Sequence, residues 1–517
     1  MILALALVIV AGCQAVGGVD FNAALKQSLK VTSMEGKQSL ELKLLVNEQA
    51  YKDLPEEDLA LIQLVSNLKL QIEDIKVQDA SHASYKGKLA LGEALSIGFS
   101  LKMSDMTAVV ELEGAKAPFV IDLTEEGLSA LMGMPMGTTG AVTAEDQQSM
   151  TALGHELIDS ASTFFINNLP NPENISVKAV SEPINGVSTS LMHINAELDG
   201  PAIWAWAKKY VDALAADSKG LETLITSVVT IMSDHPEIWE AAGTINPFEQ
   251  PELDAPTKEE TIKQTAQELT QLLVQLQEQI KVMETEDKES IDAILNKDTT
   301  IKTDIYVDSK LDIRKQVIEA TIKPADQLMF PVDGIVIRSE NEQWNVNGTV
   351  KADEPVVPEV AFNVGELVSM QGYQTLRLFD DKSAVYGLLK NQFKLGHQIV
   401  ALYPDYDDYP PIVTPSYATI VPLRVIAEEL GATVGYDKKT KAITVFDEAT
   451  NTTIALKEGS DMVTVNGKSV KWAFPATTPF KGTLYVSARG LADAFGAKIY
   501  WETYDNEQIF YVEREVS

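Results

Sequence analysis

Histidine is the side chain that most often serves as a metal ligand or general base, and this chain of 517 residues has five of them. They are His82, His155, His193, His235 and His397, and no two stand at ligand-pair spacing. Gly154-His155-Glu156 begins like a zinc-protease motif, but Asp159 stands where the second histidine should follow. We therefore predict that His155 is a helix-surface residue. The chain also lacks a G-x-S-x-G elbow, a phosphate-binding loop and a dinucleotide fingerprint, so we predict no catalytic residue and no cofactor.

Acidic and aromatic residues alternate in one short segment. Asp405, Asp407 and Asp408 stand among Tyr403, Tyr406 and Tyr409, directly before Pro410-Pro411. Carboxylate oxygens bind hard cations, and tyrosine rings can stack on a sugar. The EF-hand pattern is absent, because no Gly and no distal Glu follow at loop spacing. Two interpretations stay open, a ligand or cation loop and a solvated acidic loop.

The single cysteine has a position that explains it. Residues 1–10 are an apolar run too short to cross a bilayer, and Val10-Ala11-Gly12 precede Cys13 in the manner of a lipobox, whose cysteine receives a lipid. We predict a lipoprotein signal peptide over 1–13 and a tether over 14–30. The alternative is a buried free cysteine in an N-terminal helix. An export signal needs a Lys or Arg before the apolar run, and none is present. Either the start codon lies upstream or the export prediction is wrong, and we favour the first.

The formal net charge of −33 argues against one class of partner. A surface this acidic repels nucleic acid at long range, so we expect no nucleic acid. It repels anionic lipid surfaces as well, and attachment to the membrane would therefore run through the lipid on Cys13. Apolar residues make up 45% of the chain, which is enough core for the two or three domains that its length predicts.

The chain before the linker predicts one α+β domain, which we place at 31–351. Apolar and polar residues alternate at Leu40–Leu44, Leu68–Ile72 and Ile97–Leu101, which is typical of antiparallel strands with one buried face. Helices are predicted near 53–66, 144–167 and 201–242, and further strands at 175–180, 188–198, 300–307, 317–322, 334–338 and 344–351. This order predicts a curved antiparallel sheet with helices on one face. A linker rich in Pro and acidic residues follows at 352–362, and residues 363–409 are expected to supply early strands of the next domain or a lead-in to it.

The clearest predicted helix begins after Thr257. Thr257 and Glu260 form a capping box, and apolar residues recur at spacings of four and three. They are Ile262, Ala266, Leu269, Leu273, Leu276, Ile280 and Met283. This stripe is either a coiled-coil seam for a partner or a face that lies on the domain's own sheet, and we favour the second.

An apolar groove is the candidate binding site of this first domain. Met132, Met134 and Met136, in a loop rich in Met and Gly, would line it together with Trp204 and Trp206, although all five are ordinary core candidates too. A sheet with helices behind a lipobox is similar to lipoprotein carriers of the LolA and LppX type, whose half-open sheet and helices enclose such a groove. No motif carries this likeness, so it is an architectural analogy.

The C-terminal part of the chain contains a repeat. VPLRVIAEELGATVGYDKKTKAITVF from Val421 and VSARGLADAFGAKIYWETYDNEQIFYV from Val486 agree at Arg424 and Arg489, at Ala427 and Ala492, and at Gly431 and Gly496. Each copy predicts a helix closed by a Gly-Ala pair, then a strand, a polar turn and a second strand, and we place the copies near 417–447 and 482–513. Arg424 and Arg489 begin helices whose dipole they oppose, so we expect an acidic or carbonyl partner for each. A phosphate or carboxylate of a wall polymer is the functional alternative.

This repeat resembles the copper amine oxidase N-terminal-like domain, or stalk domain, of surface proteins of Gram-positive bacteria. The likeness is carried by V-P-L-R from Val421, A-E-x-L-G-A from Ala427, the aromatic-acidic pairs Tyr436-Asp437 and Trp501-Glu502, and V-N-G-K at 465–468. The second copy departs from the pattern, with Ser487 and Ala488 where Pro and Leu belong. The resemblance implies a smaller α+β repeat domain, which we place at 363–517.

The resemblance does not imply oxidase chemistry. Copper amine oxidases are known for three histidine ligands and a tyrosine converted into the cofactor. A copper centre recruits imidazole or thiolate, whereas the histidines of this chain are unpaired and its only thiol is the expected lipid anchor. We therefore expect no amine oxidase activity.

Together these predictions describe a non-catalytic, lipid-anchored protein on the extracellular face of the cell membrane. The leading hypothesis is that its stalk-type domain docks on or binds cell-wall polymer, a surface protein or itself. The alternative is a carrier whose first domain holds a lipid or other apolar ligand. An enzyme ranks third, because no constellation assigns a base, a nucleophile and an oxyanion donor.

Overall fold

The computed structural model describes residues 20–47, 55–92, 95–124, 144–235, 257–325, 331–480, 482–505 and 507–517. The chain divides into two compact units: unit 1 comprises Met1–Leu112 and Pro118–Gly365, and unit 2 comprises Glu113–Ala117 and Glu366–Ser517. Cys13 and the loop with Met132, Met134 and Met136 lie outside the described residues. Among the helices that are described, none has the length and hydropathy needed to cross a bilayer.

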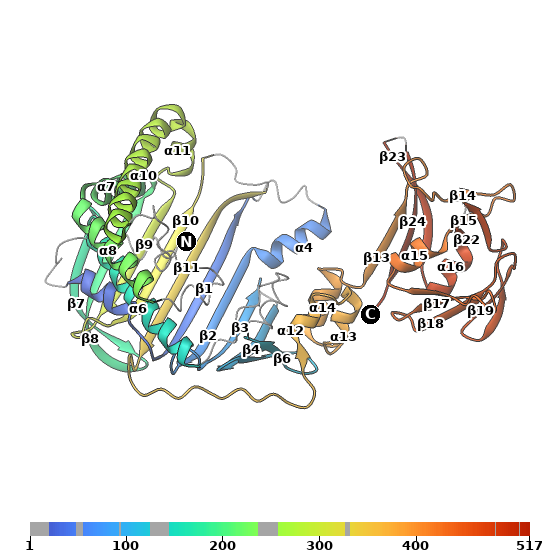
Figure 1. Ribbon diagram of the computed structural model, residues 1–517, viewed down its shortest axis with the longest axis horizontal. Coiled ribbons are helices and arrows are strands. Elements are labelled where there is room, and N and C mark those ends of the chain that lie inside the picture. The colour runs from blue at the N-terminus through green and yellow to red at the C-terminus, as the bar shows by residue number, and fades with distance from the viewer. Residues whose placement is uncertain are drawn as a thin grey trace. The chain divides into compact units, whose positions relative to one another are not determined.

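Unit 1 is built on one twelve-stranded sheet (Figure 1). Its strands are β1 (Met34–Val46), β2 (Asn67–Val77), β3 (Ala83–Leu91), β4 (Leu95–Ser104), β5 (Thr107–Leu112), β6 (Phe119–Asp122), β7 (Ile175–Ile184), β8 (Val187–Asp199), β9 (Thr300–Val307), β10 (Ile313–Ile322), β11 (Val332–Trp344) and β12 (Phe362–Asn363). Across the sheet the order is β12-β6-β5-β4-β3-β2-β1-β11-β10-β9-β8-β7. Only β12 runs parallel to its neighbour, β6, so the predicted α+β class and the antiparallel sheet are confirmed.

One predicted strand is wrong. Residues 345–351 leave the sheet, because Asn345 and Asn347 have φ angles of 50° and 52°, which extended strands do not adopt. The Asn345 side chain donates to the carbonyl oxygen of Thr349 at 2.9 Å, and asparagine tolerates the left-handed region because its short amide bonds to nearby backbone. The last strand of the sheet therefore ends at Trp344.

The helices of unit 1 gather mainly over the β7–β10 end of the sheet (Figure 1). They are α2 (Phe21–Ser28), α4 (Glu56–Val65), α6 (Ala144–Asn167), α7 (Gly200–Ala216), α8 (Ser218–Asp234), α10 (Lys258–Glu286) and α11 (Lys288–Ile294). The main core lies between α2, α6 and α7 on one side and β8, β9 and β10 on the other, with Trp206 and Ile305 among its buried side chains. Burying each side chain of this size contributes roughly 1.5–3 kcal/mol. The helical stretch predicted from 201 breaks at Asp217, whose carboxylate caps α8.

Helix α10 lies on other helices, not on the sheet, which corrects the favoured prediction. Its capping box is present, but only part of the apolar stripe is packed. Ile262, Ala266 and Leu273 contact the core between α6, α7 and α8. Leu269, Leu276 and Met283 remain 36%, 39% and 39% exposed. The sheet beneath is already covered by α7, so α10 packs on α7 and α8 and turns only half of its stripe inward.

Unit 2 contains three small sheets. Its strands are β13 (His397–Leu402), β14 (Ile412–Val413), β15 (Thr419–Pro422), β16 (Thr433–Tyr436), β17 (Ile443–Asp447), β18 (Thr452–Leu456), β19 (Met462–Val465), β20 (Lys468–Lys471), β21 (Thr477–Phe480), β22 (Thr483–Ser487), β23 (Lys498–Tyr504) and β24 (Glu507–Glu515). The sheet orders are β13-β24-β23, β14-β15-β22-β21 and β16-β17-β18-β19-β20. Its helices are α12 (Val364–Leu367), α13 (Gly372–Arg377), α14 (Ala384–Asn391), α15 (Leu423–Glu429) and α16 (Ala488–Phe495). Of the two expectations for residues 363–409, early strands or a lead-in, the stretch 364–391 contributes short helices, and β13 is the strand that follows them.

The two sequence repeats adopt the same local structure. One copy is β15-α15-β16-β17 and the other is β22-α16-β23-β24, as the sequence predicts. Gly431 and Gly496 have φ angles of +82° and +66° and end the two helices. The amide of the alanine after each glycine donates to the carbonyl oxygen five residues earlier. The distances are 2.7 Å from Ala432 to Ala427 and 2.8 Å from Ala497 to Ala492.

The pairing of β15 with β22 relates the two copies by a local two-fold axis. These strands are antiparallel, and Val421 lies opposite Val486, its own counterpart in the repeat. On either side, Pro422 lies opposite Tyr485, and Ile420 opposite Ser487. An antiparallel pair that places equivalent residues opposite each other is the pattern of a two-fold axis.

Candidate functional site

Three of the histidines that the structure describes, His82, His193 and His397, are each held by a carboxylate at a separate place. The pairs are His82 with Asp79 (2.8 Å), His193 with Asp304 (2.7 Å) and His397 with Glu513 (2.9 Å). The hydrogen bond to Asp79 raises the pKa of His82. Burial works to raise the pKa of Asp79, but bonds from His82 and from backbone amides outweigh it and lower the pKa to about 2. Within the described residues, no three His, Cys, Asp or Glu side chains lie close enough to share a metal ion.

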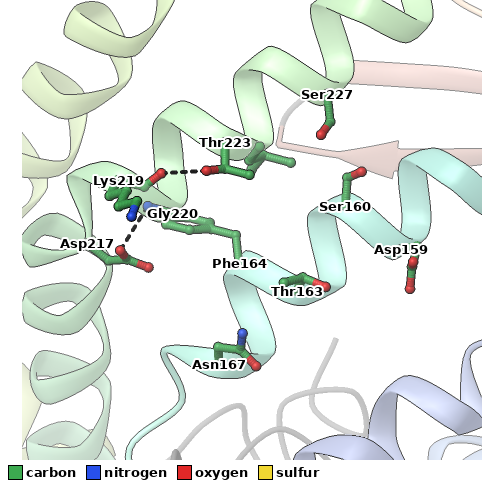
Figure 2. A pocket seen from close by; sticks show the side chains of 11 residues that line it. Asp159, Ser160, Thr163, Phe164, Asn167, Asp217, Lys219, Gly220, Thr223 and Ser227 are labelled. Carbon is green, nitrogen blue, oxygen red and sulfur yellow. Dashed lines mark hydrogen bonds between the residues drawn. The ribbon is translucent and has the colours of Figure 1, made fainter.

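A pocket of about 420 Å³ lies between α6 and α8 (Figure 2). Its rim carries the hydroxyls of Ser160, Thr163, Thr223 and Ser227. Nothing in the sequence pointed to this pocket, since single hydroxyl residues on helices are too common to mark a site.

The carboxylates of this pocket are already engaged. Asp217 Oδ1 accepts the amide of Gly220 at 2.9 Å, and Asp217 Oδ2 accepts the Asn168 amide group at 2.9 Å. Asp159 pairs with Lys30 at 2.7 Å. These carboxylates cap a helix and tie α6 to the segment that follows α2, so the pocket offers hydroxyl groups to a ligand but lacks, among its described lining residues, a carboxylate free to act as a base.

The two tryptophans predicted to line an apolar groove have structural contacts. Trp206 is 4% exposed and donates to the carbonyl oxygen of Pro170 at 2.7 Å, so it takes the core role that the sequence had left open. Trp204 donates to Glu284 of α10 at 3.0 Å and thereby links α7 to α10. Neither residue is brought to an open groove by these contacts.

Strand register places a row of leucines on one face of the other half of the unit 1 sheet. Leu40, Leu70, Leu89 and Ile97 are successive partners across β1, β2, β3 and β4, and Leu42, Leu68, Leu91 and Leu95 form the next row. We call these eight residues the leucine face. All except Ile97 are half-buried, whereas the neighbouring positions carry Glu41, Lys69 and Lys88. The leucine face is a surface that an apolar ligand could cover.

The acidic segment after β13 forms a turn. The Asp407 carboxylate accepts the backbone amide of Tyr403 at 2.7 Å, and the Asp407 amide donates back to the Tyr403 carbonyl oxygen at 3.0 Å. Asp405 and Asp408 are both exposed at the surface of this turn, whereas Asp407 is half-buried. Tyr406 of the predicted loop connects this turn to β24, because its hydroxyl donates to Glu507 at 2.5 Å.

These tyrosines belong to a larger cluster on the sheet β13-β24-β23. We define the tyrosine face as Tyr403, Tyr406, Tyr500 and Tyr511. Tyr500 and Tyr511 are cross-strand partners whose rings stack at 5.1 Å between centroids, with 24° between their planes. Tyr403, Tyr406 and Tyr500 are 38%, 70% and 37% exposed. Partial burial, together with a hydrogen bond to Glu513, raises the pKa of Tyr500, so the phenol stays neutral.

The two arginines of the repeat behave differently. Arg424 has both kinds of expected partner, Glu428 at 2.5 Å and the carbonyl oxygen of Val434 at 3.4 Å. For Arg489 the expectation fails, since no described residue gives it an ion pair or hydrogen bond. Arg489 instead lines a pocket of about 330 Å³ next to Trp472. Gly490, the residue after Arg489, lies against Trp472, whose ring occupies the space where a side chain at position 490 would lie.

Sequence reasoning missed the most buried ion pair of unit 2. Arg514 and Asp447 have side chains that are 0% and 1% exposed, with Nη1 2.5 Å from Oδ2 and Nη2 3.1 Å from Oδ1. Arg514 also donates to the carbonyl oxygen of Leu430 at 2.7 Å and to Gln398 Oε1 at 2.7 Å, and its guanidinium lies over the Phe495 ring. Burial raises the pKa of Asp447, but bonds from Arg514 and Thr450 outweigh it and hold the pKa below its ordinary value.

No sequence signal announced this pair, because a single arginine near the C-terminus resembles a solvated strand residue. The pair holds together elements of both repeats: Asp447 ends β17, Leu430 caps α15, and Phe495 ends α16. It forms the rigid base beneath the sheet that carries the tyrosine face, since Arg514 and Tyr511 lie on opposite sides of β24.

Comparison with curated proteins finds no match to this chain. Comparison with protein families finds a match to the copper amine oxidase N-terminal domain over residues 403–510. The matched residues include α15, α16 and most of both repeats. The matched family is the N-terminal domain of the oxidase and not its catalytic domain, so the match does not bring oxidase activity with it. Residues 403–510, within unit 2, form a copper amine oxidase N-terminal domain, which confirms the resemblance that the repeat indicated.

Proposed function

We propose that this chain is a non-catalytic protein of the cell envelope that docks on wall polymer through the tyrosine face of unit 2. A lipid on Cys13 would hold it at the extracellular face of the membrane, as the lipobox predicts. The observation that carries the docking function is the cluster of exposed tyrosine rings, set on a sheet whose reverse side is fixed by a fully buried ion pair.

The chemistry of this face suits a polysaccharide. Tyrosine rings offer apolar surface to the C–H faces of sugars while their hydroxyls form hydrogen bonds. Glu502 and Glu513 border Tyr500 and can accept hydrogen bonds from sugar hydroxyls. A surface built on strands keeps these groups in fixed positions, which limits the entropy lost on binding.

Cosedimentation with purified Gram-positive cell wall tests the docking function. We expect the full chain to pellet with the wall, and the double variant Tyr403→Ala/Tyr511→Ala to bind at least about tenfold more weakly, which corresponds to about 1.4 kcal/mol. Tyr417→Ala is the matched control, because Tyr417 is 92% exposed but lies outside the tyrosine face. Equal pelleting of the double variant and the wild type would rule out this surface.

The anchor has a separate test in a Gram-positive host. We expect metabolic labelling with a fatty acid to mark the wild-type protein in the membrane fraction, and Cys13→Ser to abolish the label and release the protein into the medium. A membrane-bound, unlabelled Cys13→Ser protein would contradict the lipid anchor and would leave the wall-binding result unaffected.

The leucine face favours a second candidate, a carrier of a lipid or other apolar ligand in unit 1. Its partly accessible leucines stand in rows on one side of four adjacent strands. Native mass spectrometry of protein purified from its own envelope would show a non-covalent apolar mass that Leu70→Glu removes. Gln71→Glu, on the opposite side of β2, should retain it. Absence of any bound mass in the wild type would remove this candidate.

A further inference from the structure

Strand β23 is an open edge of the sheet that carries the tyrosine face. It pairs with β24 on one side only, and it is the end strand in the order β13-β24-β23. Of its seven residues, all except Ile499 are exposed. The backbone N–H and C=O groups along the outer side of such a strand are free to pair with another strand.

The sequence of β23 is complementary to itself in the antiparallel direction. If two copies pair with Tyr500 opposite Tyr500, then Lys498 of each copy lies opposite Glu502 of the other. Ile499 lies opposite Trp501 in the same register, on the other side of the sheet. Opposite charges and aromatic pairs directly across two strands stabilise a sheet, and the two-fold symmetry makes each unlike pair occur twice.

Both charged side chains are available for this contact. Neither Lys498 nor Glu502 has an opposite charge within 4.0 Å among the described residues, and both are exposed. Within its own sheet Glu502 lies opposite Ile509, so no neighbouring strand supplies a cation to it. Lys498 lies opposite Glu513, whose carboxylate is instead held by a histidine at 2.9 Å.

The reverse side of β23 offers an apolar contact to a second copy. Ile499 packs at the margin of the unit 2 core, and the 37% exposed ring of Trp501 leans on Phe510. In the register centred on Tyr500, Trp501 of each copy lies opposite Ile499 of the other. The junction would therefore extend this core from one copy into the next.

Two other edge strands of unit 2 lack this property. Strand β20 is also an exposed end strand, but its only charged residues are the two lysines Lys468 and Lys471, so antiparallel pairing with itself brings no opposite charges together. Strand β16, the counterpart of β23 in the first repeat, has four residues and carries no charge. Complementarity to itself therefore distinguishes β23 from these two edges.

We infer that two copies of this chain pair through β23 in antiparallel register centred on Tyr500, forming one continuous sheet β13-β24-β23-β23-β24-β13. The pairing places the rings of Tyr511, Tyr500, Tyr500 and Tyr511 in one row across the junction, because Tyr500 and Tyr511 are already cross-strand partners in each copy. The tyrosine faces of the two copies become one surface of twice the length. The inference stands on the edge strand alone and does not require that this surface binds wall polymer.

Charge reversal on the full chain, carrying Cys13→Ser to prevent lipidation, gives a test with an internal control. Analytical ultracentrifugation at 0.15 M salt, where the Debye length is about 8 Å, limits repulsion from the net charge of −33. We expect a concentration-dependent dimer for the wild-type sequence. Lys498→Glu places two glutamates opposite each other, and Glu502→Lys places two lysines opposite each other, so each variant alone should dimerise at least about tenfold more weakly.

Mixing the two variants is the decisive step. In the mixed pair, the glutamate introduced at position 498 of one copy faces the lysine introduced at position 502 of the other. The native Glu502 and Lys498 face each other at the second contact, so a heterodimer should form with an affinity close to that of the wild type. Lys468→Glu, which changes an exposed lysine on the end strand β20, is the matched control and should dimerise like the wild type. Circular dichroism should show that all variants are folded, since the changed side chains are exposed.

Three results would overturn the inference. They are a wild-type chain that stays monomeric at about 100-fold the concentration used for wall binding, single variants that dimerise as strongly as the wild type, and a mixture that stays monomeric. Wall cosedimentation of the Lys498→Glu monomer separates this inference from the proposed function. A folded monomer that still pellets keeps wall binding independent of pairing, and a dimer that fails to pellet leaves pairing intact while rejecting wall binding.

Discussion

The pair of Arg514 and Asp447 shows how the two repeats became one fold. Tyr436 pairs with Ile443, and Trp501, the counterpart of Tyr436, pairs with Phe510. Ile443 and Phe510 are therefore equivalent positions of the two copies. Asp447 lies four residues after Ile443 on β17, and Arg514 lies four residues after Phe510 on β24, so the ion pair joins equivalent positions of the two copies. Two identical charges could not be buried together, and the unlike residues at these positions make the buried contact possible.

Removing one member of this pair should unfold unit 2 far more easily than removing an exposed ion pair. We expect Arg514→Met to lower the free energy of unfolding of unit 2 by about 3–5 kcal/mol, because Asp447 would remain buried without a counter-charge. Arg424→Met, which removes the exposed pair with Glu428, is the matched control and should cost less than about 1 kcal/mol. Hydrogen exchange of the slowest amides in β17 and β24 reports on this unit alone. Equal losses in the two variants would contradict the prediction.

The same pair predicts a pH dependence. Because the pKa of Asp447 is lowered in the folded protein, its contribution is complete above the unfolded pKa of about 3.9 and is lost as pH falls through the folded value. In Arg514→Met the buried Asp447 has no counter-charge, so burial raises its pKa and the variant regains stability by taking up a proton as pH falls. The difference in unfolding free energy between the wild type and Arg514→Met should therefore be largest near pH 7 and shrink steadily as pH falls, with the wild type losing its own contribution below about pH 4. Urea unfolding followed at β24 amides measures the unfolding free energy of each protein. A difference between the two proteins that persists unchanged at pH 2 would contradict this role of Asp447.

Gly490 should tolerate no side chain. A methyl group there would lie 2.5 Å from Cγ of the buried Trp472, so we expect Gly490→Ala to destabilise unit 2 by about 1–3 kcal/mol through overpacking. Gly387 in α14 has no atom within 4 Å of such a methyl group, and Gly387→Ala should stabilise by up to about 1 kcal/mol through helix propensity. The two changes differ in sign, which thermal unfolding of unit 2 resolves. A stabilising Gly490→Ala would show that Trp472 can move away.

At the scale of elements, α10 shows how a helix can satisfy only part of an apolar pattern. The packed part faces the core between α6, α7 and α8, and the remainder, with Leu272 at 59% exposure, faces outward. The rotation of the helix is fixed by two contacts near its C-terminal end, where Glu284 accepts from Trp204 and pairs with Lys208, both on α7.

Adjacent leucines of α10 should therefore respond differently to a charge. We expect Leu273→Asp to reduce the protection of α10 and α8 amides by about 2 kcal/mol, because the carboxylate would enter an apolar contact. Leu272→Asp should change protection by less than about 0.5 kcal/mol, because this side chain is mainly in water. Hydrogen exchange of the full chain compares them directly, and similar losses at both positions would show that the outer side of α10 is also packed.

At the scale of the whole molecule, the chain visits unit 2 twice. Residues 113–117 belong to it although they stand between β5 and β6 of unit 1. Lys116 donates its amide to the carbonyl oxygen of Leu378 at 2.9 Å, and the Asp380 amide donates to the carbonyl oxygen of Gly114 at 2.8 Å. The folded unit 2 also reaches beyond the matched residues 403–510, since β13, α13 and Arg514 complete its core.

This discontinuity predicts how a fragment would behave. A fragment of residues 366–517 keeps the pair of Arg514 and Asp447 but loses Gly114 as the acceptor for the Asp380 amide. We expect β24 amides to keep the protection seen in the full chain, and the amide of Asp380 to exchange about fivefold faster, as expected for one lost hydrogen bond of about 1 kcal/mol. Unchanged exchange at Asp380 would contradict the role of residues 113–117.

The sequence by itself determined what depends on local pattern. Alternation at Leu40–Leu44 indicated a strand, the capping box at Thr257 indicated a helix start, and the repeated Gly-Ala pairs indicated two helix ends and the family of the C-terminal domain. These features follow from side-chain periodicity and backbone preferences within a few residues. The wrong strand at 344–351 has the same local origin, since its asparagines adopt left-handed turns that alternation does not reveal.

Tertiary structure decided what depends on partners far apart in the chain. The apolar stripe of α10 did not predict which of its residues would face α7 and α8, because the packing surface of those helices determines it. The tyrosine face joins residues from the acidic segment and from two strands of the last repeat, and only strand register brings Tyr500 against Tyr511. Arg514 became a buried residue because β24 places it against Asp447 from the other copy of the repeat. Burial and pairing are properties of the assembled fold, and a single segment does not contain them.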